Sequence, residues 1–361
     1  MKAFLRRYRA QLRWLAGLAA FFALFFPLRT CRSAMNWLCG RVILPLEQAL
    51  GRLCGLTSVS VAEVLILSGI FAAVFYLAWQ LRCLIARPRK GQRAIRMGLT
   101  VLCAGLSVYA GFCLLWGVFY GADSFQDKSG LTARGGTVEE LTALTQRFAD
   151  ELSGLAPQVE RDENGCFAVS RQAIFDDAMT AYDGILEEFD CLSRPRTMPK
   201  AFVSSRGMSY LDFSGFYFPF TGEANLNDES PAVYLPANIC HELAHQQGIA
   251  TEQECNFVAI MAAASHESAA YRYSGYLMGY VHLGNALYRT DPEAWQVIRD
   301  SLPDTVRADL RQNSVYWAQF HGLVNTAATK VYDGFLKSNG VADGVQNYGT
   351  VVDLLLAYYY G

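Results

Sequence analysis

Acidic side chains are almost absent from the first third of this 361-residue sequence. Residues 1–120 carry 15 Lys and Arg but only two acids, Glu47 and Glu63, which makes their net charge +13. The remaining residues carry 16 Lys and Arg against 31 Asp and Glu, a net charge of −15. This uneven distribution of charge indicates that the two parts of the chain lie in different surroundings. The acidity of the second part argues against a nucleic-acid partner, which would need a basic surface.

Charge is also scarce within three apolar runs of the basic part, at about 14–28, 61–81 and 97–120. A helix needs about 20 residues to cross the hydrocarbon layer of a membrane, and the second and third runs are long enough. No strong polar face interrupts either run, which disfavours the alternative of two buried helices in a soluble core. The first run resembles a signal peptide, but no clear small-residue cleavage site follows it, so we expect a retained span. The sequence therefore predicts a membrane region at 1–120 with three transmembrane helices.

The distribution of Lys and Arg predicts which way these spans run. Eleven lie before the first span or between the second and third, whereas four lie in the segment 29–60. Because Lys and Arg are enriched on the cytoplasmic side, we expect the N-terminus and the 82–96 loop there. The third span then carries the chain after Tyr120 to the outer side. The prediction is a multi-pass protein of the cell membrane, with the lipid bilayer as a partner and an extracytoplasmic C-terminal domain.

No two of the ten cysteines have the CxxC spacing, which argues against a structural zinc site made of thiolates. Six lie in the membrane part, where we expect them to act as small apolar residues. The other four can form disulfides if the compartment is oxidising, in a pairing that the sequence leaves open. They are Cys166, Cys191, Cys240 and Cys255.

Beyond the membrane part, residues 121–137 are rich in Gly, Ser and Asp and are expected to form a linker to a domain at 138–361. Helices are expected from a capping box at Thr137 and Glu140 to Leu155, over 171–189, from an N-cap at Asn238 to Gly248, and over most of the remainder. Extended segments are expected at 200–204, 210–220 and 232–235. No internal repeat is visible. The expected fold is α+β, mostly helical, with few strands.

Histidine is rare too, and two of the five lie in the stretch CHELAHQQGIATEQECN at 240–256. On a helix, His241 and His245 are one turn apart and face the same way. Their imidazoles can bind one Zn²⁺, with Glu242 angled toward a water molecule in the open position. The alternative is a surface helix with incidental histidines, because the five-residue pattern is short.

A catalytic zinc site needs a third protein ligand, and the acids that follow are the candidates. Glu252 and Glu254 begin what is expected to be a new helix and lie about 200° apart around its axis, so only one can face the metal. Asn256 is one turn beyond Glu252, where its amide can orient a zinc-bound imidazole. We therefore expect Glu252 to be the ligand, with Glu254 as the alternative.

The HExxH pattern followed by Glu252-x-x-x-Asn256 resembles the gluzincin type of zinc metallopeptidase, in which the first Glu of the second motif is the third ligand. Together with three spans, the segments PFTGEAN, HELAHQQG, YRYSGY and KSNGVADG resemble a bacterial family of membrane-anchored proteins of unknown function, whose outer domain is similar to a zinc metallopeptidase. The resemblance implies a zincin-like domain, one Zn²⁺ ion, and a peptide or protein substrate, with Glu242 as general base on a zinc-bound water. Two alternatives stay open: a zinc-binding receptor or scaffold without turnover, and a zinc amidase acting on a cell-wall substrate.

Two further segments offer candidate residues. The aromatic segment before the histidines is either a hairpin or an edge strand onto which a peptide substrate can add, through Phe220, Thr221, Gly222 and Glu223. In the run YRYSGY, Tyr273 or Tyr276 can donate a hydrogen bond to an oxyanion, although packing in the core is the commoner role of such rings. His266 and His282 can be ligands, but an isolated histidine is more often structural.

Overall fold

The structure of the chain is a computed structural model that describes residues 2–322, 325–326, 329–330, 334 and 349–361. The N-terminal helices are α1 (Lys2–Arg7), α2 (Arg9–Arg29), α3 (Arg32–Leu38), α4 (Leu44–Cys54), α5 (Val61–Ala86) and α6 (Lys90–Phe112). The later helices are α7 (Phe125–Ser129), α8 (Val138–Leu155), α9 (Arg171–Asp176), α10 (Ser205–Tyr210), α11 (Leu235–Gln246), α12 (Glu252–Ala264), α13 (Ala269–Thr290), α14 (Pro292–Ser301), α15 (Asp304–Ala318) and α17 (Gly349–Tyr360). The strands are β1 (Lys200–Phe202), β2 (Gly215–Phe218) and β3 (Glu223–Asn227). The prediction of a mostly helical chain with few strands is confirmed.

Three helices are long and apolar enough to cross a membrane: α2, α5, and α6 with the π-helical turn that continues it to Gly117. They contain the three predicted runs, except that the third ends at Gly117 and a 3₁₀ turn, Phe119–Gly121, follows. The rest of the chain buries only 11% of the most apolar window of each helix. Side chains such as Phe71, 74% exposed, therefore require an apolar surrounding, as a lipid bilayer provides.

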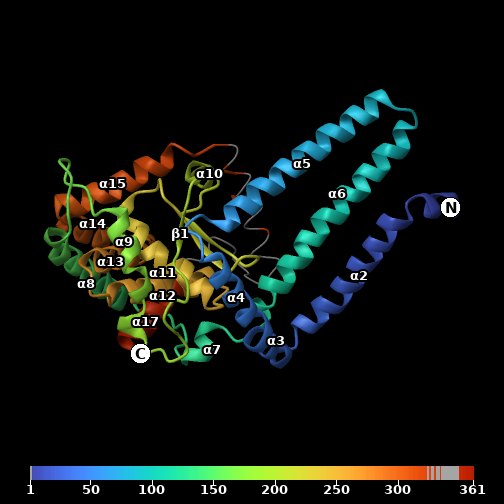
Figure 1. Ribbon diagram of the computed structural model, residues 1–361. Coiled ribbons are helices and arrows are strands. Elements are labelled where there is room, and N and C mark those ends of the chain that lie inside the picture. The colour runs from blue at the N-terminus through green and yellow to red at the C-terminus, as the bar shows by residue number, and fades with distance from the viewer. Residues whose placement is uncertain (1, 323–324, 327–328, 331–333, 335–348) are drawn as a thin grey trace.

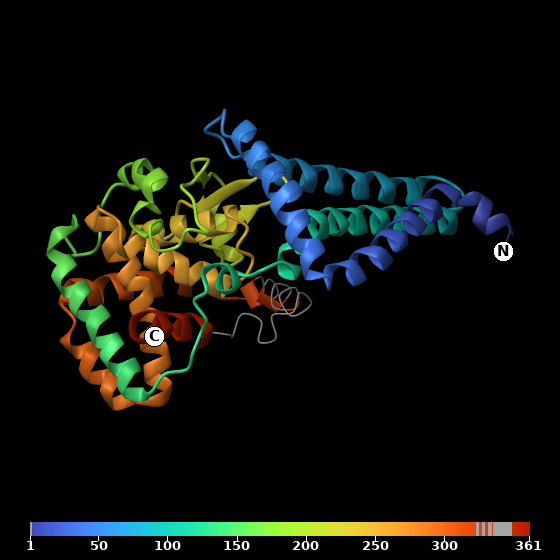
Figure 2. The ribbon, with the colours of Figure 1, turned by 90° about the horizontal axis from the view of Figure 1, so that it is seen from below.

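These spans project from one side of the globular domain (Figures 1 and 2). The N-terminus lies at their far end, together with the loop between α5 and α6, so the eleven Lys and Arg of the orientation argument lie remote from the domain. The segment with four Arg, residues 29–60, lies at the other end of the spans, beside the domain. The two basic groups are thus separated along the spans.

The chain between the first two spans folds onto the domain. Helices α3 and α4 are joined by a π-helical turn at Cys39–Ile43. The amide of Asn36 donates to Asp123 Oδ2 at 2.7 Å, next to α7, which lies within the predicted linker and begins with a capping box. In α4, a Cβ atom on Gly51 would lie 2.7 Å from the carbonyl oxygen of Gly222, so glycine permits this close approach of two backbones.

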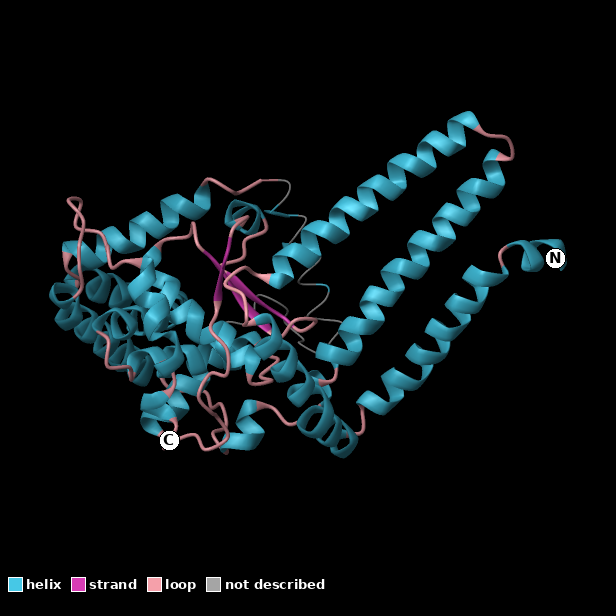
Figure 3. Ribbon diagram, in the orientation of Figure 1, coloured by secondary structure: helices cyan, strands magenta, loops and turns pink. Residues whose placement is uncertain are grey.

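The three-stranded sheet lies between the helical body and the spans (Figure 3). The strand order is β1-β3-β2, with β1 parallel and β2 antiparallel to β3. Strand β3 is buried along its length, and β2 is an edge strand of this sheet. The tight connection of the β2–β3 hairpin contains Gly222 with φ of +67°, a left-handed conformation that suits glycine.

The sheet is joined to the second span by a buried ion pair. Lys200 of β1 and Glu223 of β3 approach to 2.6 Å, and their side chains are 6% and 3% exposed. The carboxylate of Glu223 also accepts hydrogen bonds from the first backbone amides of α5, including that of Ala62 at 2.7 Å. An anion at a helix N-terminus is favourable because four amides there have no partner within the helix. The start of α5 is therefore held against the sheet.

Several predicted elements differ from the structure. The segment 171–189 forms only α9 and then short 3₁₀ turns, because Tyr182 is fully buried and donates to the carbonyl oxygen of Cys240 at 2.6 Å. This contact with α11 overrides the helical periodicity. The expected extended segment 210–220 contributes only β2, and 232–235 is a 3₁₀ turn that leads directly into α11. The capping box at Thr137 and the end of α8 at Leu155 are as predicted.

Helices α8, α11, α12, α13 and α17 surround the main hydrophobic core. Helix α13 crosses α8 at Gly279, where a Cβ atom would lie 2.2 Å from the ring of Phe148. Helices α11 and α12 are neighbours in this body, joined by a short loop, and α11 also packs against β3. This body fixes the two helices that carry the histidines and the acids after them.

Candidate metal centre

Helix α11 carries the two histidines and begins earlier than predicted. It starts at Leu235 with Pro236 in its first turn, where proline is well tolerated, so Asn238 lies inside the helix and the prediction of Asn238 as N-cap is wrong. The helix ends at Gln246, and Gly248 follows with φ of +83°, as a C-terminal glycine should. A Cβ atom on Gly248 would also lie 2.8 Å from the ring of Phe119. The turn that sends the chain back into α12 thus depends on this glycine.

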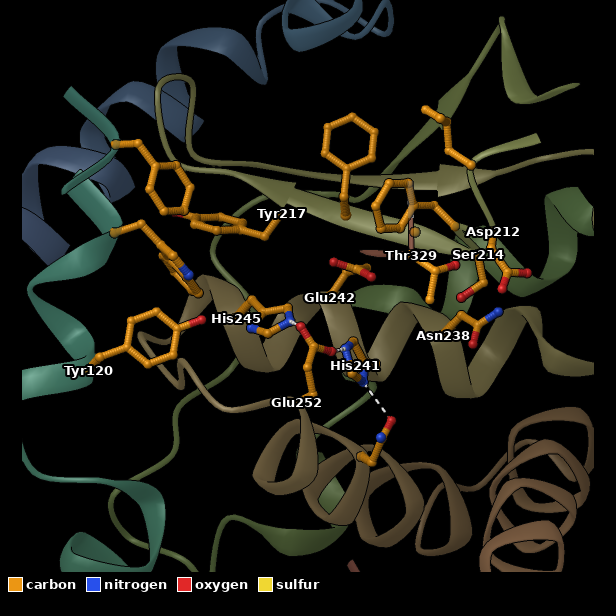
Figure 4. A pocket seen from close by; sticks show the side chains of 17 residues that line it. Tyr120, Asp212, Ser214, Tyr217, Asn238, His241, Glu242, His245, Glu252 and Thr329 are labelled. Atoms are coloured by element: carbon orange, nitrogen blue, oxygen red, sulfur yellow. Dashed lines mark hydrogen bonds and ion pairs between the residues drawn. The ribbon is translucent and has the colours of Figure 1, made fainter. Parts of the chain in front are cut away.

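Helices α11 and α12 bring three potential ligands together (Figure 4). Ligand atoms of His241, His245 and Glu252 all lie within 4.8 Å of one another. The carboxylate of Glu252 lies between the rings, with Oε2 at 3.1 Å from His241 Nε2 and Oε1 at 3.7 Å from His245 Nε2. Two imidazoles and one carboxylate in this arrangement can hold a metal ion.

The second nitrogen of each imidazole is held by an oxygen that can only accept a hydrogen bond. His241 Nδ1 lies 2.9 Å from Asn256 Oδ1, and His245 Nδ1 lies 2.8 Å from the carbonyl oxygen of Ile249. These oxygens favour the tautomer in which Nδ1 carries the proton and donates it. The lone pair of a neutral ring is then on Nε2, facing Glu252. Metal-ligating histidines are commonly fixed in this way.

Glu254, the alternative ligand, points elsewhere. Its Oε1 accepts from the backbone amide of Gln126 at 3.0 Å, and its Oε2 accepts from the Thr251 hydroxyl at 2.8 Å. Glu254 is 2% exposed and joins the start of α12 to α7. The helical phase thus separates the two acids, and Glu252 is the one beside the imidazoles.

The carboxylate of Glu242 lies in the same pocket and has an oxygen without a partner. Glu242 is 4% exposed, and its Oε2 makes no hydrogen bond among the described residues. Burial raises the pKa of Glu242 to about 7, partly offset by the neighbouring His241 and His245. Strand β2 passes very close to it: a Cβ atom on Gly215 would lie 2.6 Å from Glu242 Oε1. A buried carboxylate of this kind can accept and release a proton near neutral pH.

The charges around the three ligands favour a cation. Burial by itself lowers the pKa of His245, but Cys255 and Glu252 outweigh it and hold that pKa well above its usual value. Burial likewise opposes ionisation of Glu252, yet hydrogen bonds from the two imidazoles, which Nε2 donates when the rings are protonated, keep the pKa of Glu252 well below its usual value. The carboxylate is therefore negative, and positive charge is stabilised between it and the rings.

The cavity around these groups has a volume of about 470 Å³ and is lined by three parts of the chain and by Thr329. The α11–α12 pair forms its floor, and residues 211–217, which include most of β2, form one side. The other side comes from the end of the third span, through Phe112 and Trp116, and from the turn that follows it, through Tyr120. The ring of Trp116 contacts His245 edge-on, with centroids 5.4 Å apart. A membrane helix thus contributes directly to the site.

A family model described as "Protein of unknown function (DUF3810)" matches residues 41–356. The chain belongs to the DUF3810 family. No curated protein and no solved structure matches the chain. The matched region includes α4, the second and third spans and all of the residues that line the cavity, whereas the whole of the first span precedes it.

In this DUF3810 chain, the tyrosines proposed as oxyanion donors lie outside the cavity. Tyr276 packs edge-on against Phe148 in the α8–α13 contact, with centroids 5.2 Å apart. Tyr273 is fully buried and donates to Asp309 at 2.5 Å. Neither ring lines the cavity, so the expectation for Tyr276 is corrected: a side chain at this place in α13 serves the core.

The other two candidate histidines are not part of the ligand group. His266 stacks on Tyr271, and its Nε2 lies 3.1 Å from the Thr180 hydroxyl. Burial lowers the pKa of His282 to about 4, with a smaller contribution from His241, so its imidazole is neutral. Ligand atoms of these residues do not join the group of His241, His245 and Glu252.

The four residues expected to bind substrate, 220–223, are also placed differently. They form the connection of the β2–β3 hairpin and the start of β3, which pack against α4, α5 and α6. Phe220 lies against Gly111 of the third span, and Glu223 is the buried partner of Lys200. The strand that lines the cavity is β2, a few residues earlier. The segment KSNGVADG, residues 337–344, lies outside the described residues.

Several groups at the site had no recognisable signal in the sequence. Trp116 and Tyr120 belong to a run whose composition indicates only a membrane span. Tyr217 reaches from β2 to the buried carboxylate of Glu47, at 3.0 Å from its Oε2. All ten cysteines are free thiols, and Cys255 Sγ lies 3.2 Å from His245 Nδ1.

Proposed function

We propose that this chain is a membrane-anchored zinc metallopeptidase that hydrolyses peptide bonds on the outer side of the membrane. One observation carries the proposal: His241, His245 and Glu252 converge in one cavity beside the buried carboxylate of Glu242, whose Oε2 has no partner among the described residues. Structural acids and histidines normally satisfy one another, so an orphaned carboxylate oxygen beside three potential ligands requires an explanation.

The residues present fit zinc. Two neutral imidazoles and one carboxylate are a common ligand set of catalytic zinc, which keeps a further position open. Asn256 and the carbonyl of Ile249 hold the imidazoles in the tautomer that a metal requires. Zinc, when bound, lowers the pKa of a coordinated water and polarises a carbonyl group.

The proton transfers fall to Glu242. In hydrolysis of a peptide bond, the oxygen of water bonds to the carbonyl carbon and the bond to nitrogen breaks. Glu242 accepts a proton from the attacking water and returns it to the leaving amine, which completes the balance. The same carboxylate must therefore be a base in the first transfer and an acid in the second.

The edge strand β2 supports a peptide as substrate. It lines the cavity and, in the described part of the chain, pairs only with β3. An extended peptide can add to the other side of such a strand through main-chain hydrogen bonds. The placement on the outer side rests on the eleven-to-four distribution of Lys and Arg along the spans.

The test compares the full-length chain in detergent with its Glu242→Gln variant. Each protein is analysed for bound zinc and incubated with a mixture of random-sequence peptides, and the products are identified by mass spectrometry. We expect equal zinc in both proteins and a fall in hydrolysis of about 10²–10⁴-fold in the variant, because only the general base is lost.

The same measurements separate the alternatives. Zinc binding without cleavage of any peptide by the wild-type chain would contradict a peptidase and favour a receptor or scaffold. Cleavage of cell-wall fragments but not of peptides would favour an amidase. Unchanged hydrolysis in Glu242→Gln would refute the assigned role of this carboxylate.

A further inference from the structure

The end of the third span and the turn that follows it form one wall of the catalytic cavity. Phe112, Trp116 and Tyr120 follow one another at intervals of four residues, and all three line the cavity together with the ligands. Trp116 is 6% exposed and packs between Phe119, Tyr217 and His245. The site is therefore not separated from the membrane part by a linker.

The sequence of this span indicates how deep in the membrane the residues of this wall lie. Its last basic residue before the apolar run is Arg96, and the next twenty residues end at Trp116. At 1.5 Å per residue, twenty helical residues span about 30 Å, the thickness of the hydrocarbon layer. Trp116 then lies at the outer boundary of that layer, where tryptophan is enriched, and Phe112 lies one turn, about 6 Å, inside it.

The second span gives the same boundary independently. The first basic residue at the end of this span remote from the domain is Arg82. The twenty residues that precede Arg82 begin at Ala62. The backbone amide of Ala62 donates to Glu223 of β3 at 2.7 Å, and Glu223 is paired with Lys200 of β1. The sheet that carries β2 thus rests at the membrane surface. The residue counts along the two spans therefore agree, and both place the cavity at the outer boundary of the hydrocarbon layer.

Resting on the peptidase function proposed above, we propose that the substrate is a polypeptide anchored in the same bilayer, which this site cuts within a few residues of the membrane surface. A cavity whose wall reaches about one helical turn into the apolar layer accepts an apolar side chain that emerges from lipid. A chain that passes along β2 from this wall has its next residues beside Glu242 and the three ligands.

An anchored substrate also has a kinetic advantage at such a site. Confinement to the bilayer turns encounter into a search in two dimensions, and it raises the effective concentration of the cleavable segment at the cavity. A soluble protein would need to insert an apolar segment into the surface at each encounter. We therefore expect an anchored form of a given sequence to be cut at least about tenfold faster than its unanchored form.

The first experiment identifies protein termini in host cells that carry the wild-type chain or Glu242→Gln. Termini that depend on Glu242 are expected within about ten residues of a membrane span or lipid anchor, a distance that an extended chain covers in about 35 Å. Dependent termini in soluble proteins only would overturn this inference and leave the peptidase standing. No dependent terminus at all would instead count against the peptidase itself.

The second experiment tests the wall in purified, full-length protein in liposomes. The probes are a random-sequence peptide mixture with an N-terminal palmitoyl chain and the same mixture without it. Phe112→Ser is expected to reduce cleavage of the palmitoylated peptides at least several-fold more than it reduces cleavage of the unacylated ones. Leu114→Ser is the control, because Leu114 is 41% exposed on the same helix and does not line the cavity. Equal rates for both mixtures, or equal effects of both variants, would overturn the inference.

Discussion

The two acids at the start of α12 allow the metal centre to be tested without a substrate. Glu252→Gln keeps the size of the side chain but removes the negative charge between His241 and His245. A change outside the ligand set typically weakens metal binding by about 10–100-fold. We expect Glu252→Gln to exceed this range and to lose zinc on dialysis, because two neutral imidazoles remain.

Asn256→Ala provides the intermediate case. The substitution leaves all three ligands in place but removes the oxygen that accepts from His241 Nδ1 at 2.9 Å. The ring of His241 then loses its fixed tautomer, whereas His245 keeps its bond to the Ile249 carbonyl. The expected loss of zinc affinity is about 10–100-fold, or about 1.4–2.7 kcal/mol.

Glu254→Gln is the matched control. An amide at this position still accepts from the backbone of Gln126 and can donate to the hydroxyl of Thr251, so the start of α12 is preserved. We expect wild-type zinc affinity, measured for all three variants by competition with a chromophoric chelator in detergent, with circular dichroism to verify folding. Loss of zinc in Glu254→Gln together with retention in Glu252→Gln would refute the ligand assignment.

Three further predictions concern other parts of the structure. Gly215→Ala should place a Cβ atom 2.6 Å from Glu242 Oε1 and slow hydrolysis about 100-fold with zinc retained. Gly207→Ala is the control and should have no effect, because open space surrounds Gly207. Equal effects of the two substitutions would contradict the geometry. Burial raises the pKa of Glu47 to about 9, so folded protein binds this proton more tightly than unfolded chain. Stability should fall as pH rises from about 5 to 9, and by less in Glu47→Gln, in thermal unfolding; identical pH profiles would count against a protonated Glu47. A reporter fused at residue 90 should behave as cytoplasmic and one at 361 as exported, and a cytoplasmic signal at 361 would contradict the outward domain.

The features that could be predicted from the sequence depend on residues close together along the chain. The capping box that begins α8 and the glycine that follows α11 each depend on only a few neighbouring residues. The approach of Glu252 and Asn256 to His241 follows from helical phase across one short turn, since at most 15 residues separate these groups. The apolar length of the spans needs no tertiary information at all.

The features that could not be predicted arise from contacts between distant segments. Gly215 and Glu242 approach each other because an edge strand crosses α11, and nothing near either residue indicates it. Trp116 reaches His245 from a run whose composition indicates only a membrane span. Residues 171–189 lose their helical path because Tyr182 bonds to α11, a long-range contact that outweighs local periodicity.

The only two acids of the first 120 residues, Glu47 and Glu63, both contact the C-terminal domain. Glu63 accepts from the backbone amides of Val203 and Ser204 at 2.9 and 2.7 Å, and Glu47 is bonded to Tyr217. Both are buried, so neither is a surface charge of the membrane part. A fragment that begins at residue 121 would lose these hydrogen bonds and the side of the cavity formed by Trp116. It would also lose the backbone amides of α5 that donate to Glu223. A buried ion pair that loses its other hydrogen-bond partners is costly. The site therefore belongs to the whole chain, and its chemistry has to be measured with the spans in place.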